Sequence, residues 1–422
     1  MKKWILTLIV IMMLGMIFIS CSDDSSTEPG IAEPIIFPDA NLEQRVREVI
    51  VKPSGEIFPG DVFSIIELDA SGLGITDITG IEHFVSLEVL DLGKRYDNGY
   101  CYNYISDISV LSRLRKLTEL HLSSNQIEDI SPLYLLKSLR ELNLIYNQIT
   151  DLSSLRNLVN LESLRLYGNQ IVDISSLGNL VSLRYLYLID NQIIDISSLG
   201  NLVNLRYLYL NNNQIVDISS LSNLVNLESL HLYNNQIVDI SSLSNLVNLE
   251  SLYLYNNQIV DMPSLSNLVN LRYLYLNNNQ IVDISSLSNL VNLEYLNLDY
   301  NQIVNISSLN NLVNLEYLRL ASNGIVDIYS LLQNLGLDDG DFISLYRNPL
   351  DTTSINTYIP ELESRGVSVY FGKDGSKKNI EKILFEYDDV YMKENFENEF
   401  DFKYLVEHEN NKFRNINKKE TR

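Results

Sequence analysis

Tyrosine is the residue type whose spacing most clearly suggests chemistry in this chain, and that chemistry is binding. Twelve of the 26 tyrosines stand six, four or two residues before an asparagine that recurs every 22 residues. The three groups are Tyr185, Tyr207, Tyr273, Tyr295 and Tyr317; Tyr187, Tyr209, Tyr253 and Tyr275; and Tyr167, Tyr233 and Tyr255. Residues at even spacing share one face of a β-strand, so the pattern predicts a tyrosine-rich face.

Arg165, His231 and Arg319 also stand in the column four residues before the asparagine. Together with the twelve tyrosines they are our candidate ligand-binding residues, because tyrosine offers a rigid ring with a hydrogen-bonding tip. The alternative is that these tyrosines bind no ligand. Aromatic residues suit strands for intrinsic reasons, and duplication of one repeat would copy a single tyrosine into many. We favour binding, since an exposed aromatic area of this size is usually occupied by a partner.

Catalytic chemistry finds no support in the sequence. There is no GxSxG, HExxH or glycine-rich phosphate loop, the four histidines are dispersed, and Cys101 has no histidine near it in sequence. We therefore predict a protein that is not an enzyme and has no cofactor. Two cysteines and four histidines also exclude a multi-disulfide scaffold and a zinc cluster of the usual kind.

An aspartate also recurs once per repeat, and calcium binding is one reading of that row. Each repeat supplies a single carboxylate, however, and capping of backbone N–H groups explains it, so we predict no metal site. The row comprises Asp107, Asp129, Asp151, Asp173, Asp195, Asp217, Asp239, Asp261 and Asp283. The net charge of −23, from 31 basic and 54 acidic residues, argues against a nucleic acid as partner.

The asparagine column defines the repeat that must position these residues. Its consensus is LxxLxLxxNQIVDISSLxNLVN, and a 22-residue period with this leucine and asparagine pattern predicts a leucine-rich repeat solenoid of the α/β class. The column comprises Asn103, Asn125, Asn147, Asn169, Asn191, Asn213, Asn235, Asn257, Asn279, Asn301 and Asn323. We expect a curved parallel sheet on the concave face and 3₁₀ or extended segments on the convex face, because 22 residues leave no room for a full helix.

The asparagine amides have a structural role in this interpretation. A buried amide carries two donors and an acceptor, so it can bridge backbone groups of its own turn and the neighbouring one, and the stacked amides should form a ladder. A single repeat has two open faces and cannot be stable alone, so both ends need caps. Residues 35–64 supply an N-terminal helical cap, 65–348 the repeats, and 349–371 a C-terminal cap of a helix followed by an edge strand.

The N-terminus predicts export and lipid anchoring. Lys2 and Lys3 precede an apolar run of signal-peptide length, so we interpret 1–20 as a lipoprotein signal peptide. The segment Phe18-Ile19-Ser20-Cys21 resembles a lipobox, which implies acylation of Cys21, the chain's only contact with a membrane. Residues 21–34 then form a flexible tether. An ordinary cleaved signal peptide and an uncleaved anchor are the alternatives.

The sequences of the two caps and the repeats together resemble one family of leucine-rich repeat proteins. Over about residues 36 to 371, the chain resembles the internalin-type repeat proteins of bacterial surfaces. Four features carry this resemblance: FPDANLEQRVRE, LDASGLGITDITGIEHFVSLEVLDL, the NQIxDIssL units and DGDFISLYRNPLDTTSINTYIPELESRGV. This resemblance implies a solenoid whose concave side binds a protein or carbohydrate. The immunoglobulin-like domain and wall anchor of internalins proper are not visible, so the resemblance supports the fold more than a role in cell invasion.

Two segments depart from the repeat. An eight-residue insertion between Leu92 and Asn103 is either a thumb beside the sheet or a tolerated surface loop. Residues 372–422 have no 22-residue period, and we interpret them as a mobile tail with one weak helix, although a truncated gene end or an altered frame would look the same.

The sequence leaves three functions open. The first is a monomeric module anchored in the bacterial cell envelope, at the outer membrane or cell surface, that binds an extracellular protein or glycan through the tyrosine-rich sheet. The second is a structural envelope component that associates with itself and has no dedicated ligand. The third is an inhibitor that holds a partner enzyme in its concavity.

Overall fold

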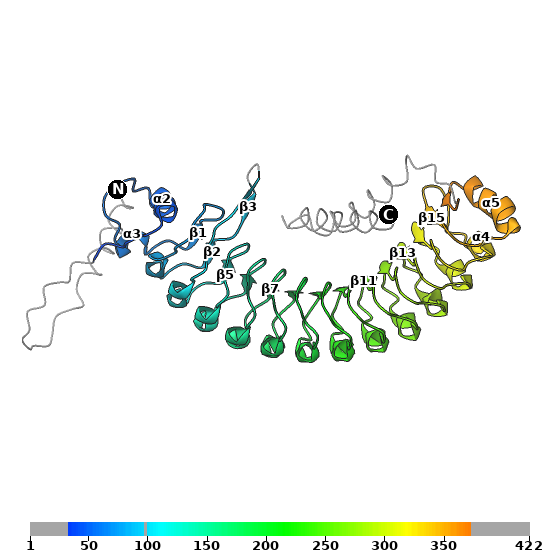
Figure 1. The fold of residues 1–422 in the computed structure, drawn as a ribbon, viewed down its shortest axis with the longest axis horizontal. Helices are drawn as coiled ribbons and strands as arrows, with labels where there is room; N and C mark the ends of the chain where they lie inside the picture. Colours follow the sequence, from blue (N-terminus) through cyan, green and yellow to red (C-terminus); the bar gives the residue numbers. More distant parts are fainter. Residues whose placement is uncertain (1–32, 97–98, 373–422) are drawn as a thin grey trace, which may run out of the picture.

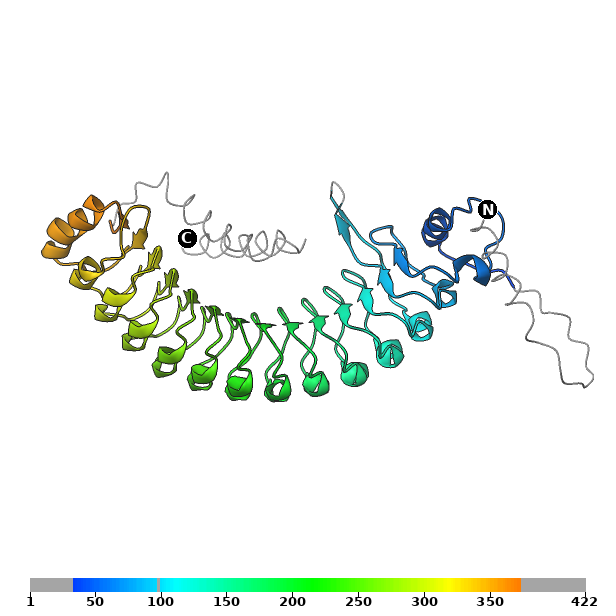
Figure 2. The same cartoon turned by 180° about the vertical axis from the view of Figure 1, so that it is seen from behind.

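The computed structural model describes residues 33–96 and 99–372. These residues form one curved solenoid, in which the strands line the inner side of the arc and compact turns line the outer side (Figure 1). The view from behind shows the same arc with the caps at its two ends (Figure 2). No helix in the described part of the chain is both long and apolar enough to cross a membrane.

The concave face is a 14-stranded sheet in which every strand pairs in parallel with the strand of the next repeat. Its order is β1 (Glu67–Asp69), β2 (Val89–Asp91), β5 (Glu119–His121), β6 (Glu141–Asn143), β7 (Ser163–Arg165), β8 (Tyr185–Tyr187), β9 (Tyr207–Tyr209), β10 (Ser229–His231), β11 (Ser251–Tyr253), β12 (Tyr273–Tyr275), β13 (Tyr295–Asn297), β14 (Tyr317–Arg319), β15 (Phe342–Ser344) and β16 (Ser368–Tyr370). The central leucine of each repeat strand points into the core, so the residues on either side of it face the concavity.

The convex face consists of short 3₁₀ turns, as the 22-residue period predicts. They are η1 (Ile81–His83), η2 (Ser109–Arg113), η3 (Ser131–Leu135), η4 (Ser153–Asn157), η5 (Ser175–Asn179), η6 (Ser197–Asn201), η7 (Ser219–Asn223), η8 (Ser241–Asn245), η9 (Pro263–Asn267), η10 (Ser285–Asn289) and η11 (Ser307–Asn311), and a short helix, α4 (Tyr329–Gln333), takes the same place in the following repeat. The aspartate two residues before a turn caps it, as where Ser219 N–H donates to Asp217 Oδ1 at 2.8 Å.

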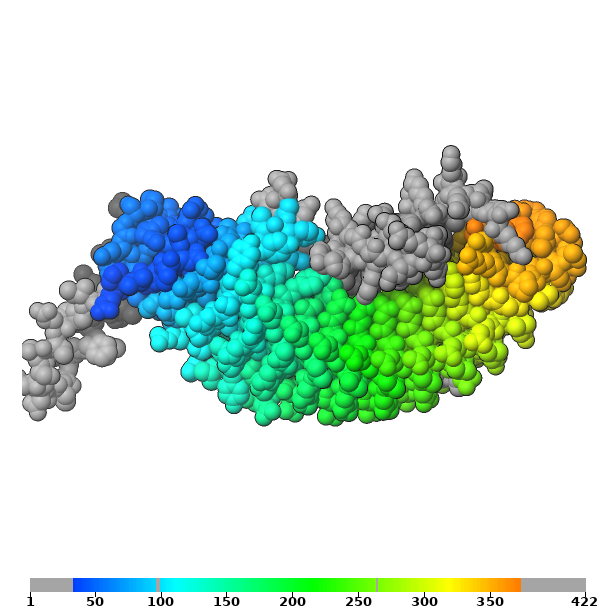
Figure 3. Space-filling view, in the orientation of Figure 1, coloured from blue at the N-terminus to red at the C-terminus, as the bar shows by residue number. Residues whose placement is uncertain are grey.

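One hydrophobic core runs through the whole solenoid, from Ile35 in the N-terminal cap to Val367 in the C-terminal cap. The space-filling view shows the repeats packed into one unbroken arc (Figure 3). Each repeat buries its leucines and isoleucines against both neighbours, so no repeat has a core of its own.

The asparagine amides connect neighbouring turns. Asn213 Nδ2 donates to the carbonyl groups of Leu188 and Leu210 at 2.9 and 3.0 Å, and its Oδ1 accepts from Ile193 N–H at 3.0 Å. The same pattern recurs along the column, and we call these side chains the asparagine ladder. It continues one step beyond the sequence pattern, because Asn348 Oδ1 accepts from Ile325 N–H at 3.0 Å. The spacing from Asn323 to Asn348 is longer than 22 residues, which hid this member from the periodicity.

Both ends of the core are covered. At the N-terminus, helix α2 (Ala40–Val49) buries Leu42 and Val46 and is followed by the short helix α3 (Pro59–Val62). Asp39 caps α2 through Oδ1, and its Oδ2 accepts from Thr76 N–H at 2.8 Å, which ties the cap to the first repeat. At the other end, a π-helical turn, η12 (Ser354–Tyr358), leads into helix α5 (Ile359–Ser364) and the edge strand β16.

The insertion forms an antiparallel hairpin of β3 (Arg95–Tyr96) and β4 (Tyr100–Cys101), which stands out on the concave side of the arc (Figure 1). It therefore takes the form of a thumb. Cys101 is a free, half-buried thiol on this hairpin. Residues 1–32, which include the signal peptide, Cys21 and most of the tether, and the tail from residue 373 onwards lie outside the described residues.

Candidate functional site

The concave face carries the candidate binding residues together. Strand register aligns Tyr185 with Tyr207, Arg165 with Tyr187, and His231 with Tyr209 and Tyr253. Most of these rings form two aromatic clusters that are separate from the hydrophobic core. The side chains that the sequence grouped by column thus lie on one face of the molecule.

Eight of the rings form one continuous stack along the concave face, which we call the aromatic spine: Tyr187, Tyr209, His231, Tyr253, Tyr275, Tyr295, Tyr317 and Phe342. Successive ring centroids lie 4.1 to 4.8 Å apart. Most pairs are close to parallel, and the pair formed by Tyr209 and His231 is tilted by 30°. This spacing matches the distance between neighbouring strands, so the sheet itself sets the stack.

The spine changes column halfway along the solenoid. From Tyr187 to Tyr275 it uses residues four before the ladder asparagine, and from Tyr295 onwards residues six before it. In the next strand the residue paired with Tyr275 is Asn297, which has no ring, so Tyr275 stacks on Tyr295 across the diagonal at 4.5 Å. The column pattern in the sequence did not reveal this crossing, nor the terminal ring Phe342.

Shorter stacks flank the spine. Tyr185 lies on Tyr207 at 5.1 Å, and Tyr233 lies on Tyr255 at 4.2 Å. Tyr273 has the Arg272 guanidinium over its ring and donates a hydrogen bond from its hydroxyl to Glu294 at 3.1 Å. These contacts organise the tyrosines that do not belong to the spine.

The expectation of a broadly exposed tyrosine surface needs correction. Seven of the twelve predicted tyrosines, and His231 with them, are buried: Tyr167, Tyr209, Tyr233, Tyr253, Tyr275, Tyr295 and Tyr317. For the five tyrosines of the spine the physical reason is stacking, since each has neighbouring rings over both of its faces. Tyr167 packs against Tyr146, and Tyr233 stacks on Tyr255. Five predicted tyrosines remain at least partly exposed: Tyr185, Tyr187, Tyr207, Tyr255 and Tyr273.

His231 is the one spine member with an ionisable nitrogen near neutral pH, and its surroundings keep it neutral. It is 4% exposed and packs between Tyr209 and Tyr253, and Ser229 Oγ lies 3.0 Å from its Nε2. Burial lowers the pKa of His231 to about 3. The imidazole therefore acts as an aromatic ring in the stack at physiological pH.

The two predicted arginines differ in their surroundings. The Arg165 guanidinium lies 5.7 Å from the centre of the Tyr187 ring and so adjoins the first ring of the spine. Arg319 Nε donates to Asp299 Oδ2 at 2.7 Å, and Asp299 is 3% exposed. Burial raises the pKa of Asp299 although Arg319 opposes that shift. Arg319 therefore forms an ion pair within the chain, and its position in the sequence column did not predict this contact.

A row of charged residues borders the sheet where the strands begin. Arg140 pairs with Glu162, Arg206 with Glu228 at 2.9 Å, and Arg272 with Glu294 at 2.8 Å, each across one repeat. These are exposed pairs, so each contributes little to stability. Within the described residues, no group of three or more histidine, cysteine, aspartate or glutamate side chains is placed to hold a metal ion.

The parallel sheet, the 3₁₀ turns and the asparagine repeat define the class of this chain as a leucine-rich repeat protein. The family model described as "Leucine Rich repeats (2 copies)" matches eight overlapping windows from residue 137 to 334, and the model "Leucine Rich Repeat" matches residues 116–137. This fold is typical of protein-binding modules. A search of curated proteins gave no match.

Solved structures specify the family. The internalin InlF of Listeria monocytogenes is 36% identical, with a TM-score of 0.73 over 82% of this chain and 100% of that chain. The chain belongs to the internalin family of leucine-rich repeat proteins. A leucine-rich repeat protein of Leptospira interrogans, at 23% identity and a TM-score of 0.56 over 74% of this chain and 97% of that one, shares the fold.

Proposed function

We propose that this chain is a binding module, anchored in the bacterial cell envelope, that recognises an extracellular protein through its concave face. The observation that carries the proposal is the aromatic spine, an eight-ring stack on the concave side of an internalin-family solenoid. A stack of this kind is a rigid support that loses little side-chain entropy when a ligand binds to it.

The stacking geometry favours a protein over a glycan at this face. A sugar ring binds most strongly to an open aromatic face, and the faces inside the spine are covered by neighbouring rings. What the partly exposed Tyr185, Tyr187 and Tyr207 offer a ligand is ring edges and phenol groups, beside the charge of Arg165. That combination suits the mixed apolar and hydrogen-bonding surface of a protein.

We infer that first contact is made at the N-terminal end of the spine. Tyr185 is 38% exposed, Tyr187 and Tyr207 are half-buried, and Arg165 lies beside Tyr187. Rigid tyrosines beside an arginine are the composition that hot spots of protein interfaces favour. The remaining rings hold these residues in register.

The anchoring part of the proposal rests on the sequence. Acylation of Cys21 and the tether that follows it would hold the solenoid at the outer membrane or cell surface. Because the sequence contains no GxSxG, HExxH or glycine-rich phosphate motif, we infer a role without enzymatic activity.

The test is affinity capture of extracellular proteins by the full-length chain, with two matched triple variants. Tyr185, Tyr187 and Tyr207 are changed to serine in one, and Tyr134, Tyr300 and Tyr329, which are exposed outside the strands of the sheet, in the other. We expect one protein to be retained by the wild type and the second variant and lost by the first, with unchanged circular dichroism. Equal retention by both variants would refute recognition through the concave face.

A second candidate function, self-association into an envelope structure, has its own observation. Two rows of aliphatic side chains run along the flanks of the solenoid and are 40% to 58% exposed. They are Val172, Ile194, Val216, Val238, Val260, Val282, Val304 and Val326, and Val159, Val181, Val203, Val225, Val247, Val269, Val291 and Val313. Sedimentation of the full-length chain at micromolar concentration distinguishes the two functions, since a monomer argues against this one.

A further inference from the structure

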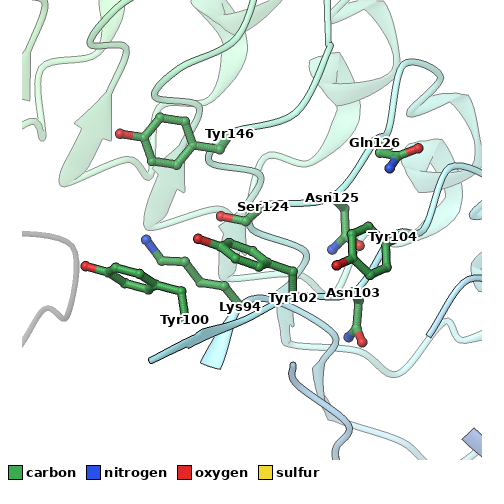
Figure 4. A pocket seen from close by; sticks show the side chains of 9 residues that line it. All are labelled: Lys94, Tyr100, Tyr102, Asn103, Tyr104, Ser124, Asn125, Gln126 and Tyr146. Atoms are coloured by element: carbon green, nitrogen blue, oxygen red, sulfur yellow. The ribbon is translucent and has the colours of Figure 1, made fainter. Parts of the chain in front are cut away.

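The hairpin and the repeats beside it enclose a pocket that is separate from the aromatic spine. The cavity has a volume of about 390 Å³, a size that small-molecule sites commonly have. We call it the hairpin pocket, and its lining residues are Lys94, Tyr100, Tyr102, Asn103, Tyr104, Ser124, Asn125, Gln126 and Tyr146. Figure 4 shows Lys94, Tyr100 and Tyr146 towards one end, Tyr104 and Gln126 towards the other, and Tyr102 between them.

The pocket exists because of specific sequence departures. The insertion places Lys94, Tyr100 and Tyr102 against the repeats, and its strands pack closely over Gly72, where a Cβ would come 2.6 Å from Arg95 Cβ. Opposite them stands Tyr146, whose ring packs over Gly168 and whose hydroxyl hydrogen-bonds that of Tyr167 at 2.7 Å. Two independent parts of the chain thus contribute to its walls.

Tyr104 differs from the rings of the aromatic spine in having an open face. It is 51% exposed, and Tyr102 beside it is 38% exposed. An aromatic face carries partial negative charge and attracts the C–H groups of a sugar ring, whose polarised hydrogens are partly positive. Tyr104 therefore offers the stacking surface that the spine does not.

The polar groups of the pocket fit a sugar with a negative charge. The Gln126 side chain is exposed and offers amide donors and an acceptor, and Ser124 offers a hydroxyl. Lys94 is the single charged residue in the lining, and its Nζ lies 5.8 and 5.6 Å from the centres of the Tyr100 and Tyr146 rings. Asn103 and Asn125 contribute walls, because ladder hydrogen bonds occupy their amides.

We propose that the hairpin pocket binds a carboxylate-bearing sugar residue. Its ring stacks on Tyr104 beside Tyr102, its hydroxyls bond with Gln126 and Ser124, and its carboxylate faces the Lys94 ammonium. In a chain of net charge −23, a pocket whose only charge is positive selects an acidic sugar over a neutral one. None of the residues that line this pocket belongs to the aromatic spine, so the site adds a second ligand class beside it.

Saturation-transfer NMR on the full-length chain tests this proposal, with glucuronic acid, N-acetylneuraminic acid, glucose and galactose as probes at millimolar concentration. We expect transfer to at least one of the two acids and about tenfold weaker binding of the neutral sugars. Tyr104→Ala should abolish transfer, and Lys94→Gln should remove the preference for the acid. Neither replaced side chain belongs to the hydrophobic core, so the fold should persist.

The matched control is Tyr134→Ala, which removes an exposed tyrosine from the convex face. It should bind the acidic sugar as the wild type does. Transfer that is unchanged in Tyr104→Ala, or the absence of transfer from the wild-type chain to all four sugars, would overturn the proposal. The variant that lacks Tyr185, Tyr187 and Tyr207 should retain sugar binding, so failure of this site and failure of the concave site are distinguishable.

Discussion

The imidazole of His231 stacks on the ring of Tyr253 with centroids 4.1 Å apart and planes 17° apart. This is the closest pair in the aromatic spine among the described residues, and it lies at the middle of the concave sheet. A histidine takes this place because, when neutral, it is a flat ring that fits the spacing between strands.

Acid should therefore weaken the solenoid through His231. Its pKa is 6.5 when unperturbed and about 3 in the folded chain, so below about pH 6.5 the unfolded state binds a proton that the folded state excludes. The stability present at neutral pH is lost as the pH falls from about 6.5 towards 3, by about 3 kcal/mol near pH 4.

Urea unfolding at pH 7 and near pH 4 measures this effect against His231→Phe, which keeps a ring in the stack. The carboxylates titrate in both proteins, so the difference between the two pH dependences isolates the histidine. An identical loss of stability in wild type and variant would contradict the assignment.

The asparagine ladder should contribute more to stability than the exposed asparagines of the same repeat. Asn213→Ala removes the side-chain partner of Ile193 N–H and of three carbonyl groups, all buried. We expect a loss of about 2–4 kcal/mol in the free energy of unfolding. Asn204→Ala is the matched control, since it removes one exposed hydrogen bond to the Val181 carbonyl and should cost less than about 1 kcal/mol.

Periodicity predicted the fold because each repeat position meets the same neighbours. The 22-residue period gave the parallel sheet, the 3₁₀ turns and the shared face of Tyr185 and Tyr207. What it could not give is where a contact skips a column, as between Tyr275 and Tyr295, or joins two columns, as between Asp299 and Arg319. Such contacts depend on the residues that adjoining repeats happen to carry.

Exposure was the other property that the pattern could not supply. The alternation in a strand says which way Tyr253 points, and it does not say that a histidine on one side and a tyrosine on the other cover its ring. The hairpin pocket was hidden for a similar reason. Its walls come from an insertion and from turn residues such as Tyr146, whose position directly before the ladder asparagine is not aromatic in most repeats.

Gly168 should be intolerant of any side chain. Its φ is +67°, and a Cβ there would lie 2.5 Å from Tyr146 Cδ1. Gly168→Ala should displace the Tyr146 ring, break its hydrogen bond to Tyr167 and lower the free energy of unfolding by about 1–3 kcal/mol. Combining it with Tyr146→Ala should recover part of the loss, and thermal unfolding of the two variants compares them. No recovery would mean that backbone strain alone sets the cost.

The ion pair of Asp299 and Arg319 should be costly to break and cheap to replace. Asp299 Oδ1 accepts from Ala321 N–H at 2.6 Å and its Oδ2 accepts from Arg319 at 2.7 Å, in a place that is almost fully buried. Arg319→Leu leaves that carboxylate without its cation and should destabilise the chain by about 3–5 kcal/mol. Asp299→Asn in the same chain keeps the acceptor for Ala321 and removes the buried charge, so the double variant should regain most of that stability.

Urea unfolding of the wild type, both single variants and the double variant gives the coupling between the two side chains. Additive losses would show that the two side chains contribute independently, and Arg319 would then return to the set of ligand-binding residues.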